Sequence, residues 1–150
     1  MSVGAESNGG PRALRGVDTN VLVRYFAGDD IEHSAMARDL VARAEARGER
    51  LFVSLPVLCE LLWVFARSRY RARREELVAL VAGLLESPVF AIQDRPLVRR
   101  ALEDFRLGRA ELADYLIGRC CEAAGSSETL TFDEALLDHP HFEHPSDLVP

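Results

Sequence analysis

The stretch LFVSLPVLCELLWVFA, residues 51–66, joins a strand pattern to a helix pattern and places one acidic residue among apolar ones. The first four residues predict a buried strand. Ser54 suits the cap of the helix that Pro56 helps to begin. Glu60 then stands among uncharged residues on a largely apolar helix face. Because an ionised carboxylate buried without a partner costs several kcal/mol, we expect water or a cation beside Glu60.

Strand and helix patterns alternate on both sides of this stretch. Strand patterns cover residues 13–18, 51–54, 89–92 and 129–132. Helix patterns cover residues 19–27, 30–47, 55–66, 73–85, 95–107 and 110–124, and the tail after residue 133 predicts one more short helix. This order favours an α/β fold with a mostly parallel central sheet of four to five strands, flanked by helices.

The length and the composition indicate how the chain is divided. Residues 1–12 are small, polar and Gly-rich, which predicts a disordered N-terminal tail, and residues 13–150 predict a single domain. No apolar run approaches the roughly 20 residues of a membrane helix, and residues 1–12 lack the apolar core of a signal peptide. We therefore expect a cytoplasmic protein that does not enter a membrane.

The charge pattern leaves nucleic acid open as a partner. The net charge of −6 argues against a protein coated with basic surface for non-specific DNA binding. Five of the 18 basic residues, all of them arginine, nevertheless fall within residues 67–74. Arg69, Arg71 and Arg73 are candidates for contacts with an RNA backbone. The alternative is a solvated start of a helix.

Several acids fall where a parallel sheet gathers its ligands. Asp18 ends the first predicted strand and Asp133 the fourth, so both are expected at the carboxyl edge of one sheet. Asp114 and Glu111 lie near the start of a helix, on the same face. Together with Glu60 these acids form a cluster of oxygen ligands, which select hard cations such as Mg²⁺ or Mn²⁺. Taken singly, each aspartate has a simpler explanation as a helix cap.

Four sequence segments around these acids resemble a known protein family. The segments VDTNVLVRYF (17–26), SLPVLCELLWVF (54–65), RAELADYLIGRCCEAAG (109–125) and TLTFDEAL (129–136) resemble the PIN-domain ribonucleases, specifically the VapC toxins of bacterial toxin–antitoxin pairs. The resemblance implies a PIN-like fold. It also implies that Asp18, Glu60, Asp114 and Asp133 are the catalytic, metal-binding acids.

The same resemblance suggests roles for neighbouring residues and for partners. Glu111 matches the position of an auxiliary metal ligand, which is often aspartate in these toxins, and Asn20 and Thr131 match polar positions that orient the ligands. The implied reaction is hydrolysis of an RNA phosphodiester bond with Mg²⁺ or Mn²⁺. The implied partners are an RNA substrate, a small antitoxin protein and a second copy of this chain.

Three other functions fit the pattern less well. Haloacid-dehalogenase-type phosphatases and receiver domains also place aspartates at strand ends, but they usually need an active-site lysine, and this chain has none. A histidine nuclease or a zinc site would have to use His139, His141 and His144, which lie in a proline-rich tail without a partner motif. The remaining alternative is a catalytically inactive PIN-like module that binds RNA or protein.

Overall fold

Three short parallel strands form the first sheet in the computed structural model, which describes residues 13–148. They are β1 (Leu14–Gly16), β2 (Arg50–Val53) and β3 (Phe90–Ile92), hydrogen-bonded in the order β1-β2-β3. Leu14 is in register with Arg50, and Leu51 with Phe90. The disordered tail predicted for residues 1–12 lies outside the described residues.

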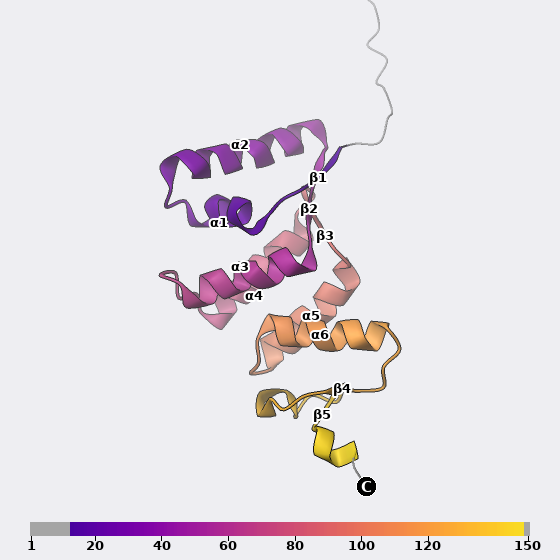
Figure 1. Ribbon diagram of the computed structural model, residues 1–150. Helices are drawn as coiled ribbons and strands as arrows, with labels where there is room; N and C mark the ends of the chain where they lie inside the picture. Colours follow the sequence, from indigo (N-terminus) through magenta and orange to yellow (C-terminus); the bar gives the residue numbers. More distant parts are fainter. Residues whose placement is uncertain (1–12, 149–150) are drawn as a thin grey trace, which may run out of the picture.

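Helices connect the strands and account for most of the described chain. They are α1 (Thr19–Ala27), α2 (Ile31–Arg47), α3 (Leu55–Arg67), α4 (Arg74–Glu86), α5 (Arg95–Leu107) and α6 (Leu112–Ala123), with short 3-10 turns η1 (Glu134–Leu136) and η2 (Pro145–Leu148). The predicted helix ranges are confirmed to within about two residues. Figure 1 shows α1 and α2 at one end of the molecule and the C-terminal segment at the other.

Local capping chemistry fixes several of these boundaries. Asp18 and Ser54 cap α1 and α3, since their side chains accept hydrogen bonds from backbone N–H groups at 3.3 and 3.4 Å. Gly28 and Gly48 end α1 and α2 in left-handed backbone, with φ of 68° and 62°. Glycine takes this conformation without a Cβ clash, and both helix ends match their predictions.

The remaining strands form a second parallel sheet. The strands β4 (Thr129–Leu130) and β5 (Phe142–Glu143) pair only with each other among residues 13–148. The prediction of parallel α/β architecture is confirmed, but five strands in one central sheet are not what this structure shows. Phe142 explains where the small sheet lies, because its ring packs so closely on Gly118 of α6 that a Cβ there would overlap it.

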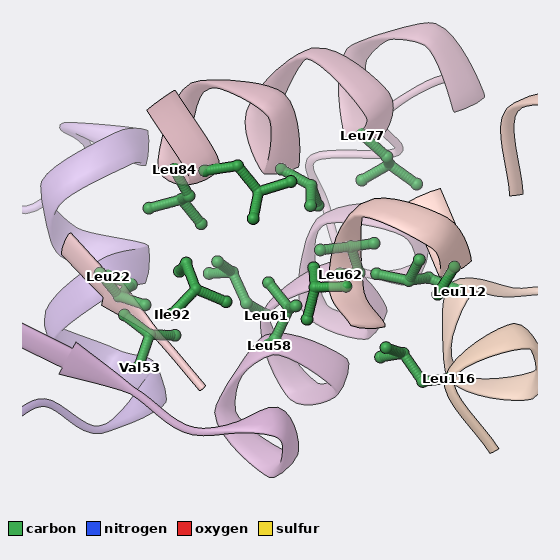
Figure 2. Close-up of a cluster of buried hydrophobic side chains, with 14 of the residues drawn as sticks. Leu22, Val53, Leu58, Leu61, Leu62, Leu77, Leu84, Ile92, Leu112 and Leu116 are labelled. Atoms are coloured by element: carbon green, nitrogen blue, oxygen red, sulfur yellow. The ribbon is translucent and has the colours of Figure 1, made fainter. Parts of the chain in front are cut away.

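A continuous apolar core joins the first sheet to helices α1 through α6. Figure 2 shows Val53 and Ile92 of the sheet facing Leu22 of α1, Leu58 and Leu61 of α3, and helix α4. Leu61 is fully buried and Leu62 and Phe65 nearly so, at 0%, 6% and 7% exposure. These three α3 side chains are therefore core residues.

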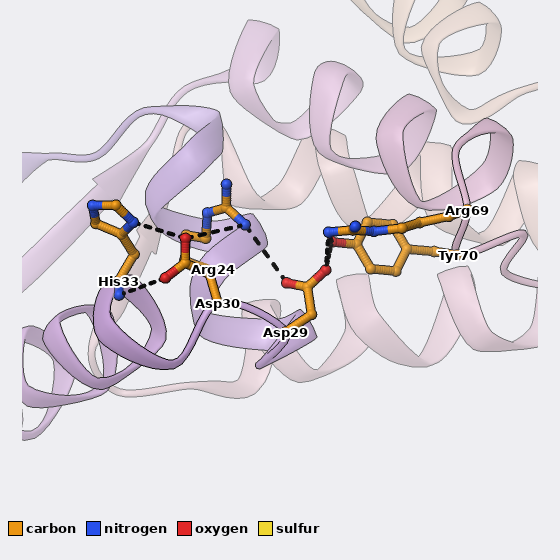
Figure 3. Close-up of polar contacts among 6 residues, drawn as sticks. All are labelled: Arg24, Asp29, Asp30, His33, Arg69 and Tyr70. Carbon is orange, nitrogen blue, oxygen red and sulfur yellow. Dashed lines mark hydrogen bonds and ion pairs between the residues drawn. The ribbon is translucent and has the colours of Figure 1, made fainter.

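A polar cluster ties the turn between α1 and α2 to the loop between α3 and α4 (Figure 3). The Tyr70 hydroxyl donates a hydrogen bond of 2.6 Å to Asp29, and Arg69 forms an ion pair with the same carboxylate. Arg24 reaches Asp29 at 3.6 Å from the other side. The Tyr70 hydrogen bond is the largest of the causes that lower the pKa of Asp29. Asp29 thus holds a constant negative charge at neutral pH that orders this loop.

The core generates a first prediction. Leu61→Ala should destabilise the protein by about 2–5 kcal/mol, because it removes buried methyl groups and leaves a cavity. The free energy of unfolding from urea denaturation measures the effect. Met36→Ala is the control, since Met36 is 62% exposed and its loss should change stability by less than about 0.5 kcal/mol. Equal effects of the two substitutions would contradict the assignment of this core.

Candidate active site

Asp18 and Glu60 meet through the first residue of α1. Asp18 follows β1 and caps α1, while the Thr19 hydroxyl donates a hydrogen bond of 2.9 Å to the Glu60 carboxylate on α3. This contact joins two segments 41 residues apart and fixes the Glu60 side chain beside the start of α1. Glu60 is therefore hydrogen-bonded to the residue that directly follows Asp18.

Asp114 and Asp133 form the second part of the site. Asp114 lies in the first turn of α6, where its carboxylate accepts a hydrogen bond of 3.0 Å from the Glu111 backbone N–H. Partial burial is the main cause that raises the pKa of Asp114, and the negative charges of Asp133 and Glu111 add to the rise. These carboxylates are thus close enough to repel one another.

Asp114 on α6 lies near the part of α3 that carries Glu60. The charge of Asp114 contributes, after burial and Cys120, to a raised pKa of the Cys59 thiol, and Cys59 precedes Glu60 on α3. Asp114 therefore lies near the stretch of α3 that carries Glu60. Asp133 follows β4 in the second sheet, so the expectation that it shares one sheet edge with Asp18 is wrong in this structure.

Glu60 differs from its prediction in one respect. Its helix face is apolar, but it is open to solvent: Glu60 itself is exposed and Trp63 is 57% exposed. The sequence analysis expected either water or a cation beside Glu60. Its carboxylate is open to solvent and accepts a hydrogen bond from the Thr19 hydroxyl. The isolated burial that would have destabilised the protein does not occur.

Among the described residues, no cationic side chain pairs with any of the four acids. Within residues 13–148, no arginine or histidine forms an ion pair with Asp18, Glu60, Asp114 or Asp133. Many other acids of this arginine-rich chain are paired, including Asp29, Asp39, Glu76, Glu103, Asp104 and Glu122. The predicted site is therefore a patch of uncompensated negative charge.

The oxygen atoms of this patch are of the type that Mg²⁺ binds. No group of three acidic, histidine or cysteine side chains within the described part of the chain converges on one point at ligand distance. Mg²⁺, however, is usually held by one or two carboxylates together with substrate phosphate and waters. The donor type fits a hard cation, and Asp114 and Asp133 lie close enough for their charges to interact.

Glu111 lies at the rim of the site with a partner of its own. Its carboxylate forms an ion pair with Arg67 at the end of α3. An auxiliary metal ligand would have to leave this arginine. The structure therefore gives Glu111 a different contact from the one that the resemblance implies, and its role as a ligand stays a prediction.

The two polar residues predicted to orient the ligands have different surroundings. Thr131 accepts a hydrogen bond of 3.0 Å from the Asp133 backbone N–H, and the Asp133 carboxylate accepts one of 2.9 Å from Ala135. Thr131 thus shapes the turn that carries Asp133. Asn20 is exposed in the first turn of α1, and its side chain forms no hydrogen bond to residues 13–148.

The arginines predicted to contact RNA lie in and beside the loop between α3 and α4. Arg69 pairs with Asp29, and Arg73 pairs with Glu76 at 3.0 Å. Arg71 is exposed and forms no ion pair within the described range. Two of the three positive charges are thus balanced by neighbours, and RNA contact at these residues stays a prediction.

Tyr115 supports the site and was missed by the sequence analysis. Its hydroxyl accepts hydrogen bonds from the backbone N–H groups of Arg109 and Ala110, at 3.2 and 3.3 Å. The Tyr115 side chain is 2% exposed, and a Cβ at Gly108 would overlap its hydroxyl. This buried hydrogen-bonded turn sets where α6, and with it Asp114, begins. A tyrosine within a run of otherwise apolar helix positions was the available signal.

A second polar cluster lies behind α6, away from these acids. Arg119 forms a two-pronged ion pair with Asp104 at 2.7 and 2.8 Å, and His139 reaches Asp104 at 3.1 Å. The His139 ring also accepts a hydrogen bond from the His141 backbone N–H. His139 therefore has structural partners on both ring nitrogens, and His144 contacts Ser146.

Comparison with protein families matches residues 17–141 to the PIN domain, over most of the chain and across both parts of the acidic site. The chain belongs to the PIN-domain family. This PIN domain is also similar to a VapC ribonuclease of Aquifex aeolicus (strain VF5). The two are 25% identical over 116 residues, which span 77% of this chain and 84% of that protein.

Within the part of the chain that the structure describes, no helix of this PIN domain is both long enough and apolar enough to cross a bilayer.

Tyr115 generates the second prediction. Tyr115→Phe should destabilise the protein by about 1–3 kcal/mol, since it leaves the N–H groups of Arg109 and Ala110 without their acceptor. Urea denaturation measures the change. Tyr25→Phe is the matched control, because the Tyr25 hydroxyl forms no hydrogen bond within residues 13–148 and its loss should be nearly neutral. If the two variants were equally stable, the hydroxyl would have no part in holding the turn.

Proposed function

We propose that this PIN domain is a divalent-metal-dependent endoribonuclease, the toxin of a toxin–antitoxin pair, and that it hydrolyses RNA phosphodiester bonds at Asp18, Glu60, Asp114 and Asp133. Family membership and similarity to a VapC ribonuclease support the reaction class. The metal, the residues and the partners are part of the proposal.

One observation carries the assignment of the residues. Four acids from distant segments form no ion pair within residues 13–148, and two of them, Asp114 and Asp133, lie close enough for their negative charges to interact. Packing holds Asp114 partly buried beside Asp133, although both repulsion and burial disfavour its charged form. A cation from solution would remove both penalties, and oxygen ligands select Mg²⁺ or Mn²⁺.

Each acid has a defined task in this reaction. When bound, Mg²⁺ supplies the positive charge that activates water and offsets the charge that builds on the phosphate. Asp114 and Asp133 would hold the ion, with Asp133 fixed in its turn by Thr131. Thr19 orients Glu60 toward the start of α1, and the capping hydrogen bond orients Asp18. No side chain is required as a nucleophile.

The proposal extends to partners. We infer that the active toxin meets RNA as substrate, a small antitoxin protein as inhibitor and a second copy of this chain as a homodimer. The inactive-module alternative is less well supported, because all four acids are present and none is paired within the described residues.

The third prediction tests the acids directly. The purified chain should cleave RNA with Mg²⁺ and stop when EDTA is added. Asp18→Asn and Asp114→Asn should each reduce the rate by at least about 10²-fold, the usual effect of removing a preorganised electrostatic group. Gel-based cleavage of a labelled single-stranded RNA measures the rate, and isothermal titration with Mn²⁺ should show a site that Asp114→Asn loses.

The control for this prediction is Asp39→Asn. Asp39 is exposed on α2 and paired with Arg43 at 2.9 Å, so its neutralisation should leave both cleavage and Mn²⁺ binding unchanged. Thermal unfolding of each variant confirms that the fold is kept. Full cleavage by Asp18→Asn and Asp114→Asn at saturating metal would refute the assignment.

A further inference from the structure

A groove beside the acidic site has no role in the reaction described so far. It encloses about 750 Å³ between α3, the start of α4 and the turn between α5 and α6. Its walls are formed mainly by Leu62, Trp63, Ala66, Leu77, Phe105 and Leu112, and Glu60 and Glu111 lie on its rim. We call this the α3–α6 groove. Because Glu60 and Glu111 line both the groove and the edge of the acidic site, a polymeric ligand bound at the acids could continue into the groove.

Trp63 is the feature of the groove that core packing leaves unexplained. It is 57% exposed, whereas its helix neighbours Leu61, Leu62 and Phe65 are buried. An indole that lines a concave, partly apolar surface offers a flat face on which another ring can stack. The Arg67 guanidinium already lies 5.6 Å from the centre of the Trp63 ring.

The charges along the groove indicate what kind of ligand fits. Arg67 and Arg109 both line it, and Arg109 forms no ion pair within residues 13–148. Arg74 is engaged in the structure instead, donating hydrogen bonds of 2.9 and 2.6 Å to the Phe105 and Ala110 carbonyls. The apolar wall, the exposed indole of Trp63 and the unpaired Arg109 together match a base with its phosphate better than an uncharged apolar segment.

Resting on the proposed ribonuclease function, we propose that the α3–α6 groove binds an unpaired nucleotide of the RNA next to the scissile phosphate, with its base stacked on Trp63 and its phosphate contacted by Arg109. Arg67 flanks the stacked base and stays paired with Glu111, which marks the boundary between the groove and the acids. A base inside a duplex presents no free face to Trp63. The substrate is therefore single-stranded at this position.

The chain offers a direct probe, because Trp63 is its only tryptophan. Titration with a short single-stranded oligoribonucleotide in EDTA, where no metal-dependent cleavage occurs, should quench the Trp63 fluorescence in a saturable way. The same sequence as a blunt duplex should quench far less. No saturable quenching by single-stranded RNA, or equal quenching by the duplex, would overturn the proposal and leave the groove to a protein partner.

Variants test the stacking contact itself. By fluorescence anisotropy of labelled RNA in EDTA, Trp63→Ala should weaken binding by about 5- to 150-fold, the range for loss of one base–aromatic stack. Trp63→Phe should recover most of the affinity. Arg109→Gln should reduce the dependence of affinity on salt. Phe26→Ala removes a 38% exposed aromatic of α1 outside the groove and is the control that should bind normally.

The outcomes separate this proposal from the ribonuclease function. Metal-dependent cleavage with normal RNA binding by Trp63→Ala would overturn the groove proposal and leave the ribonuclease intact. Quenching of Trp63 together with weaker RNA binding by Trp63→Ala in the anisotropy assay, without cleavage by the unaltered chain, would support an RNA-binding groove on a domain that is not a nuclease.

Discussion

Repulsion between carboxylates that packing forces together is the constraint on which the site depends. Two contacts fix the position of α6. The Tyr115 hydroxyl accepts hydrogen bonds from the turn before the helix, and the Phe142 ring packs against Gly118. These contacts keep Asp114 partly buried near Asp133. Core packing and the hydrogen bond from the Glu111 backbone N–H to Asp114 maintain this arrangement against the repulsion, and a cation is the simplest species that would relieve it.

The arginines explain why this charge stays available. A chain rich in arginine has many opportunities to neutralise its acids, and it uses them at the α1–α2 turn, along α2, within α5 and between α5 and α6. At the rim of the site Arg67 takes Glu111, so the nearest positive charge is already engaged. Within the described residues the four acids of the site are thus left without an ion pair, and so is Arg109 in the groove beside them.

Sequence could predict the parts of the molecule that depend on neighbours along the chain. Asp18, Ser54, Gly28 and Gly48 act within one turn of their own helices, so their caps and helix ends followed from residue type alone. The position of the second sheet depends on the packing of Phe142 against Gly118. The exposure of Glu60 depends on how α3 packs in the fold. Tyr115 and the Arg67–Glu111 pair likewise join residues whose proximity only the folded chain creates.

The central claim is the proposal that a divalent cation binds at the acidic site, held by Asp114 and Asp133 with Asp18 and Glu60 nearby. Paramagnetic broadening by substoichiometric Mn²⁺ of backbone amide signals, recorded by NMR on the labelled chain, tests it most directly. The account predicts that signals around Asp18, Glu60, Asp114 and Asp133 broaden together, and that excess Mg²⁺ restores them. Broadening confined to Asp29 and Asp30, or to the cluster at Asp104 and His139, would contradict it.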